Sequence, residues 1–97
     1  MKNIALKIDQ NDNVATALSD IEAGATVTVR GDQDIEIVVS SHIPRGHKFA
    51  LSDISQGSSV IKYGEVIGIA TRDIKKGDYV HIHNLDSIRG KAGDNYG

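Results

Sequence analysis

One eleven-residue motif occurs three times in the chain and constrains its fold more than any other feature. The segments ALSDIEAGATV, ALSDISQGSSV and ATRDIKKGDYV, at 17–27, 50–60 and 70–80, share the pattern A-x-x-D-I-x-x-G-x-x-V. Their spacings of 33 and then 20 residues are unequal, so they do not predict a solenoid, which needs a constant period. The motif therefore predicts that one small domain uses the same local structure three times.

Each copy of the motif is interpreted as a turn between two strands. Asp20, Asp53 and Asp73 can accept hydrogen bonds from backbone N–H groups just downstream and so start a turn. The isoleucine that follows each aspartate can anchor the turn in the core, and the glycine supplies a position with φ > 0 that a branched residue avoids. The valine begins the next strand. These aspartates are therefore predicted to be structural rather than catalytic.

The composition favours strands over helices. The chain has 13 Ile and 8 Val against one Phe and no Trp, and β-branched residues prefer strands. Further strands are predicted at 26–31, 35–44, 65–71 and 79–84. Residues 1–8 predict an edge strand, and Gly68 inside its strand predicts a bulge or a close backbone approach. Segment 13–24 has helical propensity, but its match to the other two motif copies favours a strand and turn.

Charge and composition exclude several classes of protein. The net charge of -2 and the scattered basic residues argue against nucleic-acid binding. There is no cysteine, hence no disulfide and no thiolate metal site, which fits the reducing cytoplasm. No signal-like or membrane-spanning apolar run is present, so a soluble cytoplasmic protein is predicted. The Gly-rich, polar residues 89–97 predict a flexible tail or the start of a linker.

The sequence VHIHNL, at 80–85, places two histidines one residue apart. In a strand, the period of two sets His81 and His83 on one face, about 7 Å apart, with Val80, Ile82 and Leu85 serving the core or the strand end. Such a pair can converge on a metal ion, act in acid–base catalysis, or simply be solvated. Two histidines fall short of a closed zinc site, which needs four ligands.

A second polar segment, IPRGHKFAL at 43–51, joins a turn to a positive charge. Pro44 ends a strand, Gly46 lets the chain turn, and His47 and Lys48 follow directly. A histidine beside a lysine suits a carboxylate or a developing oxyanion. An ordinary exposed loop explains the same residues equally well.

In IKYGEVIG, at 61–68, Lys62, Tyr63 and Glu65 surround a glycine turn, which favours a structural hairpin. The sequence has no P-loop, no G-x-G-x-x-G, no Ser–His–Asp spacing and no calcium loop. A chain this small with separate polar clusters is predicted to supply part of a site rather than a whole one.

Taken together, these segments carry a family resemblance. Residues 43–87 contain I-P-x-G-H-K, I-K-Y-G-E-x-I-G and V-H-x-H-N in this order, preceded by the related segment 14–27. The chain resembles the N-terminal SAF module of altronate and galactarate dehydratases, which is also similar to the antifreeze-like domains of sialic acid synthases. The resemblance implies a mainly β, β-clip fold of short strands with little helix, in a single domain at 1–88.

The resemblance also implies a function. It indicates a carbon–oxygen lyase (hydro-lyase) subunit or N-terminal domain that helps to remove a proton α to a carboxylate and to expel the β-hydroxyl of a sugar acid. It implies a large catalytic partner, without which the chain is inactive, and a divalent metal, iron or manganese. The related small subunits of sulfolactate sulfo-lyases keep sulfite open as the leaving group. A non-catalytic sugar-acid-binding or assembly module is the alternative of another class, and exposed strand edges predict that the isolated chain can form a homodimer.

The family motif falls on six residues of this sequence: Gly46, His47, Lys48, His81, His83 and Asn84. The resemblance implies that the three histidines are catalytic, as acid–base or orienting groups. It assigns substrate binding to the other three, with Lys48 on the carboxylate. His81 and His83 could contribute to the metal site, although most metal ligands are expected from the partner.

Overall fold

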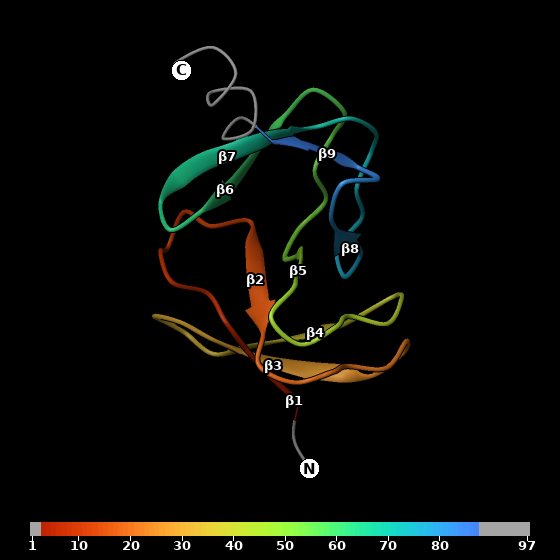
Figure 1. Cartoon of the computed structure of the whole chain (residues 1–97). Coiled ribbons are helices and arrows are strands. Elements are labelled where there is room, and N and C mark those ends of the chain that lie inside the picture. The colour runs from red at the N-terminus through yellow and green to blue at the C-terminus, as the bar shows by residue number, and fades with distance from the viewer. Residues whose placement is uncertain (1–2, 88–97) are drawn as a thin grey trace.

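The computed structural model describes residues 3–87, and this range contains strands and turns but no helix (Figure 1). Consequently no helix in the described range is long and apolar enough to cross a membrane. The nine strands are β1 (Asn3–Leu6), β2 (Val14–Ala17), β3 (Thr26–Arg30), β4 (Ile35–Val38), β5 (Lys48–Ala50), β6 (Ser59–Lys62), β7 (Glu65–Ala70), β8 (Tyr79–Val80) and β9 (Leu85–Ser87). The predicted mainly β, β-clip-type fold is confirmed, and segment 13–24 contains β2 instead of a helix.

The strands form a six-stranded mixed sheet, in the order β4-β3-β1-β2-β5-β8, and a three-stranded antiparallel sheet, in the order β6-β7-β9. β1 pairs in parallel with β3 and antiparallel with β2, so it lies in the middle of the larger sheet. The strand predicted near the N-terminus is confirmed, but its prediction as an edge strand is wrong. Figure 1 shows β6, β7 and β9 at one end of the molecule and β1, β3 and β4 at the other, with β2 and β5 between them.

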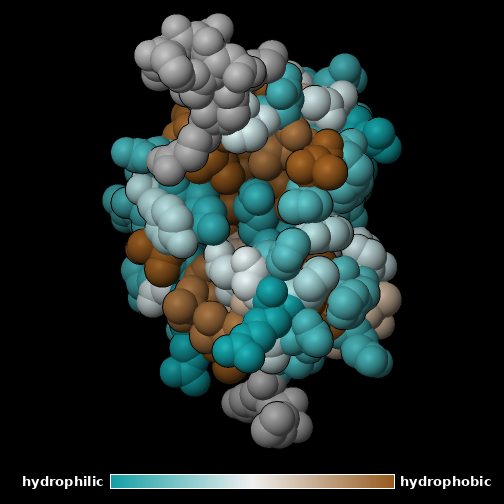
Figure 2. Space-filling model, viewed as in Figure 1, coloured by the Kyte–Doolittle hydropathy of each residue, from teal (hydrophilic) through white to brown (hydrophobic). Residues whose placement is uncertain are grey.

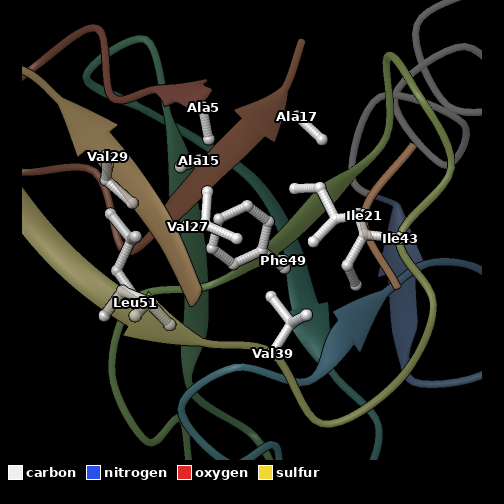
Figure 3. Packing of buried hydrophobic residues seen from close by; sticks show 11 residues of the cluster. Ala5, Ala15, Ala17, Ile21, Val27, Val29, Val39, Ile43, Phe49 and Leu51 are labelled. Atoms are coloured by element: carbon white, nitrogen blue, oxygen red, sulfur yellow. The ribbon is translucent and has the colours of Figure 1, made fainter. Parts of the chain in front are cut away.

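Two clusters of buried side chains form the core. The larger one surrounds Phe49, and Figure 3 shows Ile21, Val27, Val39 and Ile43 around its ring. The smaller one consists of Val14, Ala50, Ile54, Val60, Ala70, Ile74 and Val80. Most of these side chains are small or β-branched, so the core is assembled from strands rather than from large aromatic residues.

The three motif copies form the predicted turn. Their glycines have positive φ, of 83° at Gly24, 88° at Gly57 and 91° at Gly77. Their isoleucines are buried, as predicted for side chains that anchor each turn. At Gly77 a Cβ atom would also collide with the carbonyl oxygen of Val38, so this position excludes larger residues for two reasons.

The aspartates of the motif bind the turn of a second motif copy, and not their own downstream turn as predicted. Asp53 accepts a hydrogen bond from the backbone N–H of Lys76, and Asp73 accepts one from the backbone N–H of Gln56, both at 2.9 Å. The copies at 50–60 and 70–80 therefore stabilise each other reciprocally. A carboxylate reaches across because the two turns lie face to face.

The copy at 17–27 pairs in the same way with segment 39–49, which is a fourth, divergent copy of the motif. Ile21 forms an antiparallel bridge with Ile43, matching the bridge between the isoleucines of the other two copies. Asp20 accepts a hydrogen bond of 2.8 Å from the backbone N–H of Arg45. The domain is therefore built from two similar halves, each made of two facing copies.

The fourth copy was hidden because it replaces three of the five motif residues. It has Val39 for the alanine, His42 for the aspartate and Phe49 for the valine, and it retains the isoleucine and the glycine. Its Gly46 has φ of 81°, like the glycines of the other copies. His42 does not hydrogen-bond to the backbone of the facing turn within residues 3–87, so only three of the four equivalent bonds are formed.

The hairpin predicted at 61–68 is confirmed as β6–β7. Tyr63 and Gly64, with φ of 57° and 74°, form its two-residue turn. Val60 pairs with Gly68, but the next residue, Ile61, pairs with Val66. This shift in register is a bulge in β7 directly beside Gly68. A Cβ atom on Gly68 would lie 2.6 Å from the carbonyl oxygen of Asp86, so the predicted close backbone approach is present as well.

Two predicted strands are too long. The strand predicted at 35–44 ends at Val38, where the chain enters the fourth motif copy, and the strand predicted at 79–84 ends at Val80. Residues 81–84 form a turn instead. The predicted tail or linker at 89–97, and the domain boundary at 88, lie outside the described residues and stay predictions.

Candidate functional site

His81 and His83 lie on a turn that the side chain of Asn84 holds in place. The amide oxygen of Asn84 accepts a hydrogen bond of 2.9 Å from the backbone N–H of His81, and its amide nitrogen donates one of 2.8 Å to the carbonyl oxygen of Tyr79. Asn84 is 4% exposed. The predicted alternation is therefore wrong here, and Ile82, assigned to the core or the strand end, is 83% exposed.

This turn brings the two histidines beside His47, around the ring of Tyr79. The Tyr79 ring lies 5.7 Å from His47, 5.5 Å from His81 and 5.7 Å from His83, measured between ring centroids. The rings of Tyr79 and His81 are stacked, with an angle of 8° between their planes. His47 and His81 are 5.2 Å apart. These four residues, here called the histidine cluster, unite the three predicted catalytic histidines.

His47 has one ring nitrogen engaged within the cluster and the other without a partner among residues 3–87. The Tyr79 hydroxyl lies 2.6 Å from Nδ1 of His47; it donates to Nδ1 when the ring proton is on Nε2 and accepts from Nδ1 when the proton is there. Within residues 3–87, no buried side-chain nitrogen or oxygen lacks a partner. Nε2 of His47 has no partner in that range, so it is open to solvent, where an imidazole can donate or accept a proton.

A surface pocket of about 400 Å³ lies next to the histidine cluster and shares His81 with it. Lys48, the first residue of β5, and Lys62, the last residue of β6, both line it, so the two sheets each contribute one ammonium group. We call it the lysine pocket. Its full lining is Lys48, Lys62, Tyr63, Ile67, His81, Ile82, Leu85 and Ser87.

Burial and positive charge lower two pKa values at this site. Burial, followed by the charge of Lys62, lowers the pKa of Lys48. Burial, followed by the charges of His47, Lys48 and His83, lowers the pKa of His81. Because the ordinary pKa of histidine is already below 7, a lowered value leaves His81 neutral at pH 7 and able to accept a proton.

The walls of the lysine pocket are largely apolar. Ile67, Ile82 and Leu85 line it beside the two lysines. Figure 2 shows apolar side chains gathered over the end of the molecule that holds β6, β7 and β9, with hydrophilic side chains around them. Charges beside an apolar wall are screened less than charges in open water, so the lysine pocket attracts an anion more strongly than isolated surface lysines would.

The sequence matches the altronate/galactarate dehydratase SAF domain over residues 3–88. The chain belongs to this family. The SAF domain is 47% identical over 79 residues to altronate dehydratase of Escherichia coli (strain K12), covering 81% of this chain and 15% of that enzyme. It is 40% identical over 75 residues to galactarate dehydratase (L-threo-forming) of the same organism, covering 77% of this chain and 14% of that enzyme.

A third relative is smaller. The SAF domain is 34% identical over 85 residues to (2R)-sulfolactate sulfo-lyase subunit alpha of Chromohalobacter salexigens, covering 84% of this chain and 90% of that subunit. The chain thus spans about 15% of the length of the altronate dehydratases it matches, and most of the length of the sulfo-lyase subunit. These relatives are lyases, and in the dehydratases most of the polypeptide lies outside the region matched by this domain.

The histidine cluster of the SAF domain does not by itself fit the iron or manganese ion that the resemblance implies. Among residues 3–87, no group of three or more His, Asp or Glu side chains is arranged to hold a metal ion. Nδ1 of His47 is already engaged by the Tyr79 hydroxyl. The arrangement suits proton transfer and anion binding better than metal ligation.

The three predicted substrate-binding residues lie close to the cluster, but only one of them has a side chain that lines the lysine pocket. Lys48 lines the lysine pocket, whereas Gly46 is an exposed turn residue that sets the direction of the chain before His47. The amide of Asn84 faces the backbone of its own turn, so it positions the neighbouring rings.

Sequence reasoning missed two members of the site. Tyr79 lies two residues before His81, and this spacing is the signal in the sequence that could have placed its ring beside the histidines. Lys62 was recognised and assigned to the hairpin alone. Its place in the pocket depends on the tertiary structure that brings the end of β6 to the same pocket as Lys48 and His81, and no local pattern encodes that arrangement.

Proposed function

We propose that this SAF domain is the small subunit or N-terminal domain of a sugar-acid dehydratase of the altronate/galactarate type, and that it forms one wall of the substrate site. The observation that carries the proposal is that His47, His81 and His83, from two segments more than 30 residues apart, surround the ring of Tyr79, and that His81 also lines the lysine pocket with Lys48. A turn and a strand start would have no structural need for such a collection of imidazoles.

The reaction is a β-elimination from a sugar acid. Lys48 binds the carboxylate and stabilises the negative charge that develops on its oxygens when the α-proton leaves. Neutral His81 accepts a proton from the α-carbon, and another imidazole of the cluster gives a proton to the β-hydroxyl. The C–H and C–O bonds break, a C=C bond forms and water departs. One imidazole gains a proton and another loses one, so the cluster as a whole holds the same number of protons once a proton passes back between them.

The large catalytic partner completes the site. Metal binding is assigned to that partner, because residues 3–87 do not form a metal centre, and no step above depends on the metal. The chain is proposed to be inactive alone and to act in the cytoplasm, where sugar acids are metabolised.

The test is elimination by the complete enzyme, with the chain co-purified with, or joined to, its dehydratase-like partner. The double variant His81→Ala/His83→Ala is expected to lose about 100-fold or more of kcat, in the usual range for acid–base groups. His42→Ala, which removes an exposed histidine outside the cluster, is the matched control and should retain full activity. Full activity of the double variant would eliminate the catalytic proposal.

The match to the sulfo-lyase subunit makes sulfite elimination the second candidate. The same cluster would bind the carboxylate and receive the α-proton, while sulfite leaves in place of water. Assaying altronate, galactarate and sulfolactate side by side, with detection of the keto acid and of sulfite, separates the two. A sugar-acid-binding or assembly module without chemistry is the remaining alternative, which predicts ligand binding or partner binding with unaltered turnover in the histidine variant.

Self-association is proposed at the free edge of β4. This strand ends the larger sheet, and Val38 on it is 59% exposed. Unpaired edges with exposed apolar residues favour strand addition. Light scattering of the chain and of Val38→Lys should show a dimer that the variant loses.

A further inference from the structure

The tip of the 81–84 turn carries an apolar side chain where turns usually carry a polar one. Ile82 is 83% exposed, the largest fraction among the exposed large apolar side chains of residues 3–87. Turns favour Gly, Asn, Asp and Ser, and an isoleucine gains free energy when it leaves water. The exposed position of Ile82 therefore indicates burial against a surface outside this domain.

Ile82 is part of a larger apolar surface. Tyr63, Ile67 and Leu85 line the lysine pocket with it, and Tyr63 is 57% exposed. Figure 2 shows apolar side chains gathered over this end of the molecule. Single apolar residues are normal on a protein surface, whereas adjoining ones bordered by polar groups mark an interaction site. We call these four residues the apolar patch.

The turn holds Ile82 in a fixed position. The side chain of Asn84 binds the backbone of Tyr79 and His81, and its backbone N–H donates a hydrogen bond of 3.1 Å to the carbonyl oxygen of His81. The backbone N–H groups of Ile82 and His83 donate no hydrogen bond within residues 3–87. A preorganised tip loses little conformational entropy on docking, and its free donors can bind acceptors of another surface.

The charge beside the apolar patch indicates what kind of surface covers it. Lys62 lines the same pocket and forms no ion pair within residues 3–87. Its Nζ lies 4.8 Å from the centroid of the Tyr63 ring. A complementary surface is therefore apolar, with a carboxylate opposite Lys62. A second copy of the chain fits poorly, because a symmetric dimer through this patch would bring like charges together.

The apolar patch adjoins the site that the large catalytic partner is proposed to complete. His81 belongs to the histidine cluster and also lines the lysine pocket. Ser87, which ends β9, lines this pocket as well, so in the joined form of the enzyme the polypeptide that follows β9 starts at the patch. A partner seated on the patch would face the histidines directly.

We propose that the apolar patch is the docking surface for the large catalytic partner and that Ile82 is its anchor. The side chain of Ile82 enters an apolar recess of the partner, and a carboxylate of the partner pairs with Lys62. Docking there excludes water from the turn that carries His81 and His83. This inference rests on the proposed function, since it names the surface through which the same partner binds.

The test is hydrogen–deuterium exchange at the backbone N–H of His83, which is free in the isolated chain. In the complete enzyme, co-purified with or joined to its dehydratase-like partner, this exchange is expected to slow by about tenfold or more. Ile82→Asn is expected to remove most of this protection, and Lys62→Glu to reduce it. Ile35→Asn is the matched control. It removes a 40% exposed isoleucine from β4, at the other end of the molecule, and should keep the protection (Figure 1).

The outcomes separate this inference from the proposed function. Equal exchange of His83 in the isolated chain and the complete enzyme, or full protection in Ile82→Asn, would overturn the docking surface. Protection that appears in the isolated chain as its concentration rises would assign the patch to a second copy instead, and would also overturn it. The histidine-variant assay decides the proposed function independently of these results. Two-dimensional NMR spectra of the isolated variants confirm that each is folded.

Discussion

At the scale of single residues, the ring of Tyr79 organises the site. It lies against all three histidines, and its hydroxyl is bound to Nδ1 of His47. Its hydrogen bond to Nδ1 can favour one tautomer of a neutral His47, and its ring stacks on His81. Tyr79 is therefore a positioning residue that acts through its neighbours.

Replacing Tyr79 with phenylalanine separates these two roles. Tyr79→Phe keeps the ring contacts but removes the hydrogen bond, whose net free energy of about 0.5–1.5 kcal/mol corresponds to a roughly two- to tenfold loss of kcat in the complete enzyme. ¹⁵N NMR of the isolated chain should show that neutral His47 no longer has one dominant tautomer. Tyr79→Leu, which also removes the ring, should lose more activity. An unchanged His47 tautomer in the phenylalanine variant would contradict the positioning role.

At the scale of elements, the motif predicts the local parts of the fold but not the contacts between distant segments. The turns, the β6–β7 hairpin and the bulge at Gly68 depend on φ preferences and alternation, which are local, and they are confirmed. The end of β8 was missed because Asn84 captures backbone groups of Tyr79 and His81, a competition that alternation does not register. The central place of β1 depends on parallel pairing with β3, which residues 1–8 do not encode.

The pairing of motif copies makes a prediction about stability. Three aspartates bind a facing turn, and His42 stands where the fourth would be. His42→Asp should supply a bond to the backbone N–H of Ala23, the equivalent position, and raise the free energy of unfolding by about 0.5–1 kcal/mol. Urea denaturation measures the change, with His42→Ala as the control for loss of the imidazole.

The converse variant checks the same contact. Asp53→Ala removes the existing bond to Lys76 and should lower the free energy of unfolding by about 1 kcal/mol. If His42→Asp were no more stable than His42→Ala while Asp53→Ala lost this amount, the two halves would not be equivalent in their turns.

At the scale of the whole molecule, two similar halves produce one unsymmetrical site. His47 and Lys48 come from the divergent fourth copy, Lys62 from the hairpin, and His81 from the turn that ends the third copy. The residue types of the site could be predicted from the sequence, since the histidines and Lys48 stand out. Their convergence could not, because it requires the packing of both sheets.

The charge of the lysine pocket should be visible in the stability of the entire domain. Because burial and Lys62 lower the pKa of Lys48, the folded chain binds fewer protons than the unfolded chain between that lowered pKa and 10.5. Charged Lys48 therefore destabilises the fold at pH 7, and this destabilisation disappears as the pH rises through that window. Lys48→Met, which keeps most of the apolar stem, should melt a few degrees higher than the wild type at pH 7, and the difference should shrink towards pH 10.5.

Ligand reverses this relationship, because the bound carboxylate of a sugar acid favours the charged form of Lys48. At a galactarate concentration of about 100 Kd, mass action should stabilise the wild-type chain at pH 7 by about 2.7 kcal/mol, and Lys48→Met by much less. Thermal unfolding of both chains across this pH range, with and without galactarate, measures the effect, and Lys75→Met should follow the wild type throughout. Parallel pH curves for the wild type and Lys48→Met without ligand would show that charged Lys48 does not destabilise the fold and would contradict this prediction.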